Sequence, residues 1–386
     1  MKKILVIHTQ YTQTGGEDIA VRSEIEFLQK EYEVEKLIFN NTLNLRFSDL
    51  ISFIFNKNKE SVNKLIDKID VFNPDYIYIH NLWFKGSLGI LDLILKRNLN
   101  VILKLHNFRY DCARSFFSSK HLRKENLCKA CGMNSDKVGT FNKYYEDSFA
   151  KSLLVNNFGR KYFKLLQNKK LKILTLTNHH KNYLIDLGIN KKNIFVYPNP
   201  LPYLYNAQND NQKKLNQIIY AGRISKEKGL LELVNTWNSI KNNDFKLKII
   251  GEGPLFKELQ DVIASSDSID LIGYLDNNKV ANIIKESKAV VTATKLFEGQ
   301  PTLLCEASLL SVPSIFPSAG GMKDFFPKNY EFIFNQYDYK DLGRKLEQII
   351  KLSNIEKVAK ENYKHIKQYL DEERLFISFN EILESK

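Results

Sequence analysis

The sequence predicts an α/β protein of two domains, each built around a doubly wound parallel sheet. Its 386 residues exceed the usual size of a single hydrophobic core. Short apolar segments alternate with helical segments along almost the whole chain, which is typical of parallel sheets covered on both faces. The proline-rich stretch Pro198–Pro202, followed by a polar run, marks a linker. We therefore expect domains at residues 1–200 and 201–370.

Each domain is expected to contain six strands. In the first they are Lys3–His8, Val34–Phe39, Tyr76–His80, Val101–His106, Ile173–Thr177 and Ile194–Tyr197. In the second they are Gln217–Ala221, Lys246–Ile250, Asp270–Ile272, Ala289–Ala293, Ser314–Phe316 and Glu331–Phe334. The last residues read as helices, and residues 371–386 are expected to form a helix that could cross back onto the first domain.

The composition is that of a soluble globular protein, with 43% hydrophobic and 26% charged residues. No apolar run approaches the roughly 18 residues that a membrane-spanning helix needs. The segment Met1–His8 has a short apolar core and reads as a first strand rather than a signal peptide. Four unevenly placed cysteines also suit a reducing compartment, so we expect a cytoplasmic location.

Positive charge is concentrated in the first half. Residues 1–200 contain 32 Lys and Arg against 19 Asp and Glu, a difference of +13, whereas residues 201–386 contain 25 of each. A basic half could meet nucleic acid, an anionic membrane surface or an anionic substrate, or its lysines could simply be solvated.

Two features of the first domain could face a ligand. Gly15 and Gly16 lie between the first strand and a predicted amphipathic helix, where paired glycines let backbone N–H groups approach a phosphate. An ordinary glycine turn is the alternative. His106 ends a predicted strand, where it could touch a ligand or serve only the structure.

Further along, Cys112, Cys128 and Cys131, with His121, could form a structural zinc site. Cys128 and Cys131 form a single C-x-x-C pair, so free thiols are the alternative. Residues 151–172 carry seven Lys and Arg and no acidic residue, interleaved with apolar residues. Such a helix could lie in a membrane interface, but packing of its apolar face inside the domain is favoured. The same two alternatives, a membrane interface or packing inside the domain, apply to the apolar segment Leu50–Phe55.

The second domain opens with a pair of cations suited to a diphosphate. Arg223 leaves a strand end and Lys228 begins the next helix, so both charges can converge on one ligand. The segment Gly251–Pro254 after the next strand lacks a third glycine, so a nicotinamide site is poorly supported.

A helix is expected to begin at Pro301, because apolar residues recur behind it at helical spacing. Glu306 leans back toward the start of this helix, which Glu298 approaches from the preceding loop. The helix start offers N–H donors for a diphosphate, and the carboxylates can accept from sugar hydroxyls. A nucleotide sugar presents both groups, although acidic residues near helix starts are also ordinary dipole partners.

Taken together, these motifs resemble retaining glycosyltransferases of family 4, which are two-Rossmann enzymes of the GT-B fold with a cleft between the domains. The resemblance covers nearly the whole chain. It rests on Gly15-Gly16, His106, Pro198-Asn199, Gly222-Arg223 with Lys228-Gly229, and Glu298 with Glu306. The chain departs from the family at Gly320–Asp324, where Gly-Gly-x-x-Glu is common, and at Asn199-Pro200, where Asn-Gly is common.

The resemblance implies roles for these residues. Arg223 and Lys228 would bind the diphosphate, Gly15 and Gly16 would touch the donor phosphate, and His106 would face the donor sugar. Glu298 would contact the transferred sugar and Glu306 the ribose. The nucleobase would lie near Tyr274, and the backbone of Thr302 and Leu303 would meet the phosphates.

The implied activity is transfer of a sugar, with retention, from a nucleoside diphosphate sugar to a saccharide, in the synthesis of a bacterial surface polysaccharide. The acceptor would be lipid-linked and reached at the inner face of the plasma membrane, and neither a metal nor another cofactor would be required. The alternatives are another GT-B-type enzyme, such as a sugar-nucleotide epimerase, and a basic nucleic-acid-binding protein, which lacks a recognisable module here.

Overall fold

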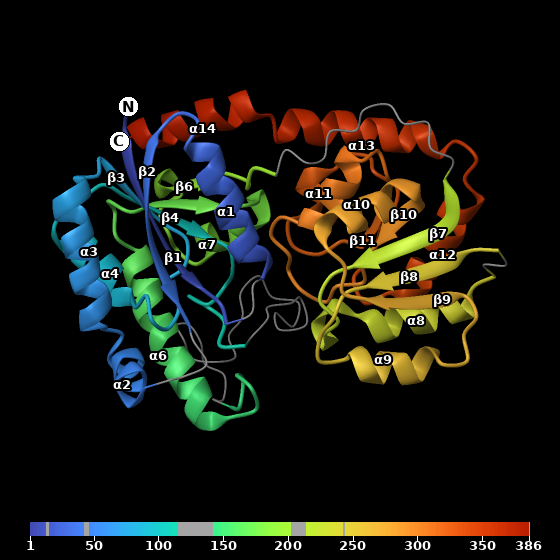
Figure 1. Cartoon of the computed structure of the whole chain (residues 1–386), viewed down its shortest axis with the longest axis horizontal. Coiled ribbons are helices and arrows are strands. Elements are labelled where there is room, and N and C mark those ends of the chain that lie inside the picture. Colours follow the sequence, from blue (N-terminus) through green and yellow to red (C-terminus); the bar gives the residue numbers. More distant parts are fainter. Residues whose placement is uncertain (13–14, 42–45, 115–141, 202–213, 242–243, 386) are drawn as a thin grey trace. The chain divides into compact units, whose positions relative to one another are not determined.

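The computed structural model describes residues 1–12, 15–41, 46–114, 142–201, 214–241 and 244–385. The chain forms two compact units, one of Met1–Leu201 with Glu372–Lys386 and the other of Pro202–Asp371 (Figure 1). Each expected strand is present, with its ends within two residues of the predicted ones. The two doubly wound parallel sheets that the sequence predicts are therefore confirmed.

The first unit has one parallel sheet in the order β2-β1-β3-β4-β5-β6. Its strands are β1 (Lys3–Gln10), β2 (Glu33–Asn40), β3 (Tyr76–Ile79), β4 (Val101–Leu105), β5 (Lys172–Thr175) and β6 (Ile194–Val196). Its helices are α1 (Gly16–Leu28), α2 (Phe47–Phe55), α3 (Lys59–Phe72), α4 (Leu88–Lys96), α6 (Phe149–Leu166), α7 (Asn178–Asp186), the short η1 (Lys191–Asn193) and α14 (Glu372–Glu384).

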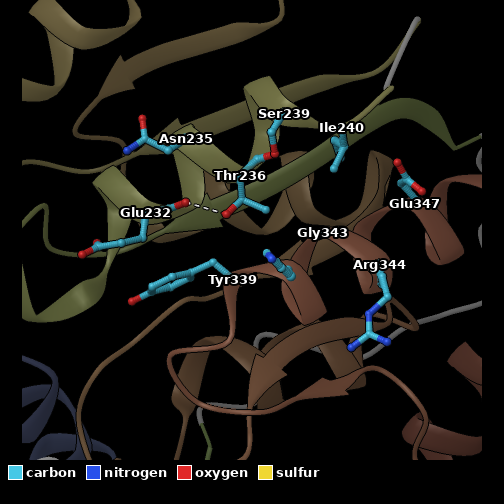
Figure 2. A pocket seen from close by; sticks show the side chains of 10 residues that line it. Glu232, Asn235, Thr236, Ser239, Ile240, Tyr339, Gly343, Arg344 and Glu347 are labelled. Atoms are coloured by element: carbon cyan, nitrogen blue, oxygen red, sulfur yellow. Dashed lines mark hydrogen bonds between the residues drawn. The ribbon is translucent and has the colours of Figure 1, made fainter.

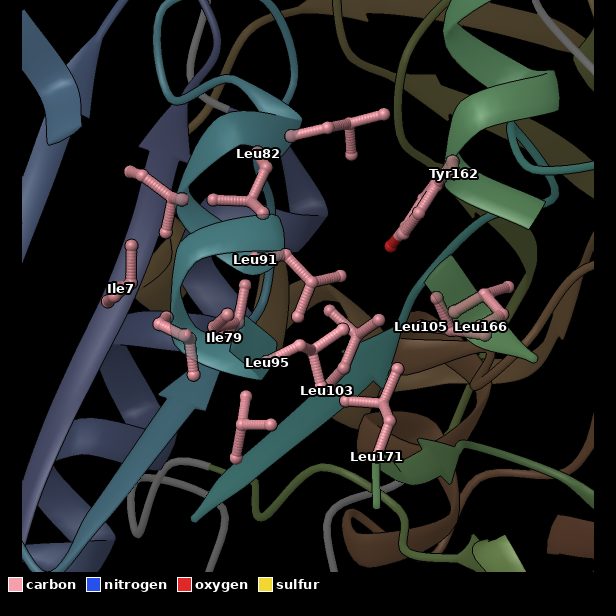
Figure 3. Packing of buried hydrophobic residues seen from close by; sticks show 14 of the residues in the cluster. Ile7, Ile79, Leu82, Leu91, Leu95, Leu103, Leu105, Tyr162, Leu166 and Leu171 are labelled. Carbon is pink, nitrogen blue, oxygen red and sulfur yellow. The ribbon is translucent and has the colours of Figure 1, made fainter. Parts of the chain in front are cut away.

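The central strands β1 and β3 are buried on both faces, which explains their continuous apolar runs. Successive side chains of a strand point to opposite faces, so Ile4 and Val6 pack with α1 and α14, whereas Leu5 and Ile7 pack with α4 and α6. Figure 3 shows the second of these layers, where leucines of β4 and α4 meet Tyr162 of α6. The sheet is thus the centre of two apolar layers.

The C-terminal helix α14 packs on the first unit. Phe376 stacks on Phe27 of α1 with ring centroids 3.9 Å apart, and Leu375 and Phe379 lie in the same buried cluster. The preceding helix α13 (Ile355–Tyr369) packs instead on α11 of the second unit. The chain therefore changes units between these two helices.

The second unit has the sheet order β12-β11-β10-β7-β8-β9. Its strands are β7 (Leu215–Ala221), β8 (Lys246–Ile250), β9 (Ile269–Gly273), β10 (Ser287–Val291), β11 (Ser314–Pro317) and β12 (Ile333–Phe334). Besides α13, its helices are η3 (Lys226–Lys228), α8 (Leu230–Ser239), α9 (Phe256–Ile263), α10 (Asn277–Glu286), α11 (Thr302–Leu309), η4 (Met322–Phe325) and α12 (Tyr339–Lys351).

The strand order reverses between β1 and β3 in the first unit and between β7 and β10 in the second. Ligands of doubly wound sheets bind at such switch points, beyond the carboxyl ends of the strands. Two places in the fold are therefore suited to a ligand before any side chain is considered. Within the described residues, no helix combines the length and the hydropathy needed to cross a bilayer.

Candidate functional site

Lys228 and Glu298 form an ion pair at the switch point of the second sheet. Lys228 ends η3, which follows β7, and Glu298 lies in the loop after β10. Lys228 Nζ donates to Glu298 Oε1 at 2.6 Å, and Thr294 Oγ1 donates to the same oxygen at 3.1 Å. Because β7 and β10 are neighbours in the sheet, residues 70 positions apart in sequence meet there.

This pair keeps Glu298 ionised. Burial alone would raise the pKa of Glu298, but the charge of Lys228 and the hydrogen bonds from Lys228 and Thr294 outweigh it, so the pKa is lowered. An ammonium group has three N–H donors, so Lys228 can hold Glu298 and still donate to a ligand.

Two glycine turns fix the backbone around the pair. Gly229 follows Lys228 with φ +70°, and a Cβ there would lie 2.1 Å from the carbonyl oxygen of Ala293. Gly320 has φ +59°, and a Cβ there would lie 2.6 Å from the carbonyl oxygen of Glu298. The N–H of Gly321 donates to that same oxygen at 3.2 Å. The Gly320-Gly321 turn therefore holds the loop that carries Glu298.

Arg223 lies at the same edge of the second sheet and is exposed. Its backbone is held by Tyr220, whose hydroxyl donates to the carbonyl oxygen of Arg223 at 2.9 Å. Its guanidinium group has no hydrogen bond or ion pair with any described residue, and it remains available to an anion.

The other predicted donor residues also lie beyond strand ends of the second sheet. Helix α11 begins at Thr302, one residue later than predicted, because Pro301 has a non-helical ψ of 82°. Thr302 and Leu303 are partly exposed in its first turn, and Glu306 is half-buried one turn further on. Tyr274 follows β9 and is 72% exposed. Their predicted roles stay predictions.

In the first unit, Asp18 organises the Gly15-Gly16 loop. The N–H of Gly15 donates to Asp18 Oδ2 at 2.8 Å, and His8 Nε2 lies 2.9 Å from Asp18 Oδ1. A Cβ at Gly16 would have no neighbouring atom within 4 Å. Asp18 therefore holds the loop at Gly15, while the space next to the Gly16 Cα is open.

His106 is brought next to His80, a residue that the sequence did not single out. His80 Nδ1 lies 3.1 Å from His106 Nε2. Burial, followed by nearby positive groups including Lys104, lowers the pKa of both rings well below the ordinary value, so both are neutral near pH 7. Since Nε2 of His106 is engaged by His80, a ligand contact would fall to Nδ1.

A polar cluster beside His106 was also missed. Tyr11 donates through its hydroxyl to Glu17 Oε2 at 3.0 Å and accepts from Arg109 at 3.1 Å, and the side-chain amide of Asn107 donates to Glu17 at 3.4 Å. Burial raises the pKa of Glu17 to about 7, against the opposing charge of Arg109. Sequence position could have indicated this cluster, because Glu17 directly follows the glycine pair and Arg109 follows His106 by three residues.

The possible zinc site is not tested, because three of its four ligands lie outside the described residues. Cys112 is buried, and Cys128, Cys131 and His121 lie outside the described residues. No group of three or more potential metal ligands occurs in the part of the chain that is described.

A pocket of about 450 Å³ lies between α8 and α12 (Figure 2). Glu232, Thr236, Tyr339 and Arg344 are among its lining residues. None of the predicted donor residues lines it, and its walls come from one helix pair rather than from strand ends. We do not assign the donor to it.

Comparisons with known proteins agree with this geometry. Residues 204–366 match the family described as "Glycosyl transferases group 1". An uncharacterised glycosyltransferase of Methanocaldococcus jannaschii is 22% identical over 99% of this chain and 98% of its own length. The amylovoran biosynthesis glycosyltransferase AmsD of Erwinia amylovora is 28% identical over 37% of this chain and 42% of its own length.

The fold is matched over the whole chain. The crystal structure of Anabaena Alr3699/HepE in complex with UDP superimposes with a TM-score of 0.70 at 13% identity, covering 100% of both chains. The chain thus has the GT-B fold, and its residues 204–366 are similar to the glycosyl transferases group 1 family.

Proposed function

We propose that the protein is a retaining glycosyltransferase that moves a hexose from a nucleoside diphosphate sugar to a lipid-linked saccharide in the synthesis of a bacterial surface polysaccharide. The observation that carries the proposal is the ion pair of Lys228 and Glu298 at the switch point. The guanidinium of Arg223, which has no partner among the described residues, lies at the same sheet edge. The complex of HepE with UDP supports a nucleotide donor. The match to AmsD supports polysaccharide synthesis.

In this proposal, two cations receive the leaving diphosphate. Negative charge develops on the leaving phosphate as the glycosidic bond breaks, and Arg223 and Lys228 would stabilise it together with the first N–H groups of α11. These groups are in place before the reaction, so no metal is required. The leaving phosphate oxygen would accept the proton of the acceptor hydroxyl.

Glu298 would orient the transferred sugar rather than attack it. Its carboxylate is ionised and already bound by Lys228 and Thr294, and these contacts lower its nucleophilicity while leaving oxygen lone pairs for sugar hydroxyls. His106, as a neutral ring, could contact a hydroxyl without adding charge. Glu306 would meet the ribose, and Thr302 and Leu303 the phosphates. The base would lie near Tyr274, and Gly15 and Gly16 would touch the donor phosphate.

The proposal predicts that Arg223→Ala lowers sugar transfer by about a hundredfold or more, the usual cost of losing a group that stabilises transition-state charge. Lys226→Ala is the matched control, because Lys226 is an exposed cation two residues before Lys228. Transfer would be measured with labelled donor sugars and a membrane extract as acceptor, with thermal unfolding showing that both variants fold.

The same assay separates the proposal from its alternatives. Transfer should persist in EDTA, and the linkage formed should keep the anomeric configuration of the donor when read by NMR. Near-normal transfer by Arg223→Ala, or an inverted product, would contradict the proposal. Conversion of the donor without any acceptor would point to an epimerase.

A further inference from the structure

The outer face of α2 is apolar. Leu50, Ile51, Ile54 and Phe55 are exposed large hydrophobic side chains, and Phe55 is 69% exposed. Their spacing places all four on one side of the helix. A surface helix normally turns polar residues outward, so this arrangement indicates a face that meets something other than water.

The inner side of α2 is fixed against α6. The ring of Phe53 packs 5.7 Å from that of Phe158 in α6 and 5.1 Å from that of Trp83. The side-chain amide of Asn157 donates to the carbonyl oxygen of Ile54 at 2.7 Å. The two helices lie side by side in Figure 1, and Asn157, which meets α2, lies one turn after Leu153 on the same side of α6.

Helix α6 adds apolar residues and cations to the same outer surface. Phe158, Tyr162 and Leu166 are buried, Tyr162 reaching toward β4 in Figure 3, as the favoured interpretation of this segment predicts. Its outer side nevertheless exposes Phe149 and Leu153 one turn apart, Leu153 being 61% exposed. The helix contains four Lys and Arg and no Asp or Glu.

We call this region the α2/α6 surface. It comprises the apolar residues Leu50, Ile51, Ile54, Phe55, Phe149 and Leu153 and the exposed cations Lys57, Arg160 and Lys164.

We propose that the α2/α6 surface docks on an anionic lipid bilayer. An interfacial helix buries its apolar side at the headgroup boundary while its cations meet lipid phosphates, and this surface offers both. Nucleic acid would engage the cations but leave the apolar residues in water. A second copy of this chain would bring two basic units together, since residues 1–200 carry a net +13 by the counts 32 and 19.

The test is flotation of the 386-residue chain with vesicles of phosphatidylcholine alone or with added phosphatidylglycerol. We expect binding to the anionic vesicles, weakening as salt is raised. The double variant Phe55→Ser/Leu153→Ser should bind at least about tenfold more weakly, because two apolar side chains no longer leave water. Lys164→Glu should bind the anionic vesicles at least about fivefold more weakly than the parent.

Matched controls lie elsewhere on the first unit. Val71 of α3 and Ile377 of α14 are 86% and 54% exposed, and Val71→Ser/Ile377→Ser should bind vesicles like the parent. Lys192→Glu, in the exposed η1, is the control for charge. Phe55→Trp should show a blue-shifted emission and quenching by bromolipids with anionic vesicles, whereas Val71→Trp should show neither.

Absence of binding to anionic vesicles, or equal losses in the controls, would overturn the proposal. So would a surface variant that lowers the molecular mass in solution without changing vesicle binding, because a second copy would then cover the surface. Nucleotide binding by the second unit is measured in parallel, and its persistence in every variant separates this proposal from the proposed function.

Discussion

The contact between Lys228 and Glu298 sets the charge of the second unit's site. Each is about three-quarters buried, with side-chain exposures of 26% and 23%. Removing one partner of such a pair leaves the other charge without its counterion in a partly dry environment. Replacing Lys228 would therefore do more than remove a diphosphate ligand, because the pKa of Glu298 would also rise.

Glu17 predicts a pH dependence of stability. Its pKa is about 7 in the folded chain, against an ordinary value of 4.5, because burial opposes its charge. Because the pKa of Glu17 is higher in the folded chain than in the unfolded chain, its protonated form favours folding. This contribution to the free energy of unfolding is fully present below pH 4.5 and is lost as the pH rises through 7. Glu17→Gln should therefore gain on the order of 1–3 kcal/mol over the parent at pH 8 and little at pH 5.

Urea unfolding of both proteins at the two pH values measures this difference. Glu26→Gln is the matched control, since Glu26 is an exposed carboxylate on the same helix α1. An equal stability difference at pH 5 and pH 8 for Glu17→Gln would show that burial does not oppose the charge of Glu17.

Residue types and spacing predicted Arg223, Lys228 and Glu298 as site candidates, but not their contacts. The 2.6 Å pair depends on β7 and β10 being neighbours, and alternating strands and helices do not reveal strand order. Lys104 shows the same limit. In the sequence, Lys104 cannot be told from the other lysines of residues 1–200. In the structure its side chain is fully buried and donates to both carboxylate oxygens of Glu24, at 2.9 and 2.8 Å.

At the element scale, the turn of Gly320 positions the loop of Glu298. A Cβ at residue 320 would approach the carbonyl oxygen of Glu298 to 2.6 Å, so the loop would have to shift. Gly320→Ala should therefore lower transfer at least about tenfold, since small misplacements of substrate-contacting groups are costly.

Gly188→Ala controls for backbone strain in this comparison. Gly188 has φ +86° with no atom within 4 Å of an added Cβ, so it carries strain of about 1–2 kcal/mol without a clash. Unfolding and transfer assays on both variants separate the two effects. Equal losses of activity in the two variants would mean that the Gly320 contact does not position Glu298.

The strands were predictable because each is a short apolar run between helical segments. The sequence of helix α2 did not decide between packing inside the domain and a membrane interface. An apolar helix face has the same sequence pattern whether it is covered or exposed. The structure identifies the exposed side of α2, because Phe53 packs against Phe158 of α6 and the opposite side is left uncovered.

At the scale of the whole molecule, the structure assigns α14 to the first unit and the preceding residues to the second. Periodicity indicated a helix there, but the aromatic packing of Phe376 on Phe27 required three-dimensional placement. Positive charge is concentrated in residues 1–200, since residues 201–386 are balanced at 25 against 25. The proposed diphosphate ligands Arg223 and Lys228 and the α2/α6 surface therefore lie on separate units and can be tested independently.

Thermal unfolding of the 386-residue chain with UDP, GDP, ADP or NAD is the sharpest test for a nucleotide site beside Lys228 and Glu298, with Arg223→Ala and Lys226→Ala in parallel. A ligand at 100 times its dissociation constant adds about 2.7 kcal/mol to stability. We expect one nucleoside diphosphate to stabilise the parent and Lys226→Ala but not Arg223→Ala. Stabilisation by none of them at millimolar concentration, or an equal effect on Arg223→Ala, would contradict a donor site at the β7–β10 switch point.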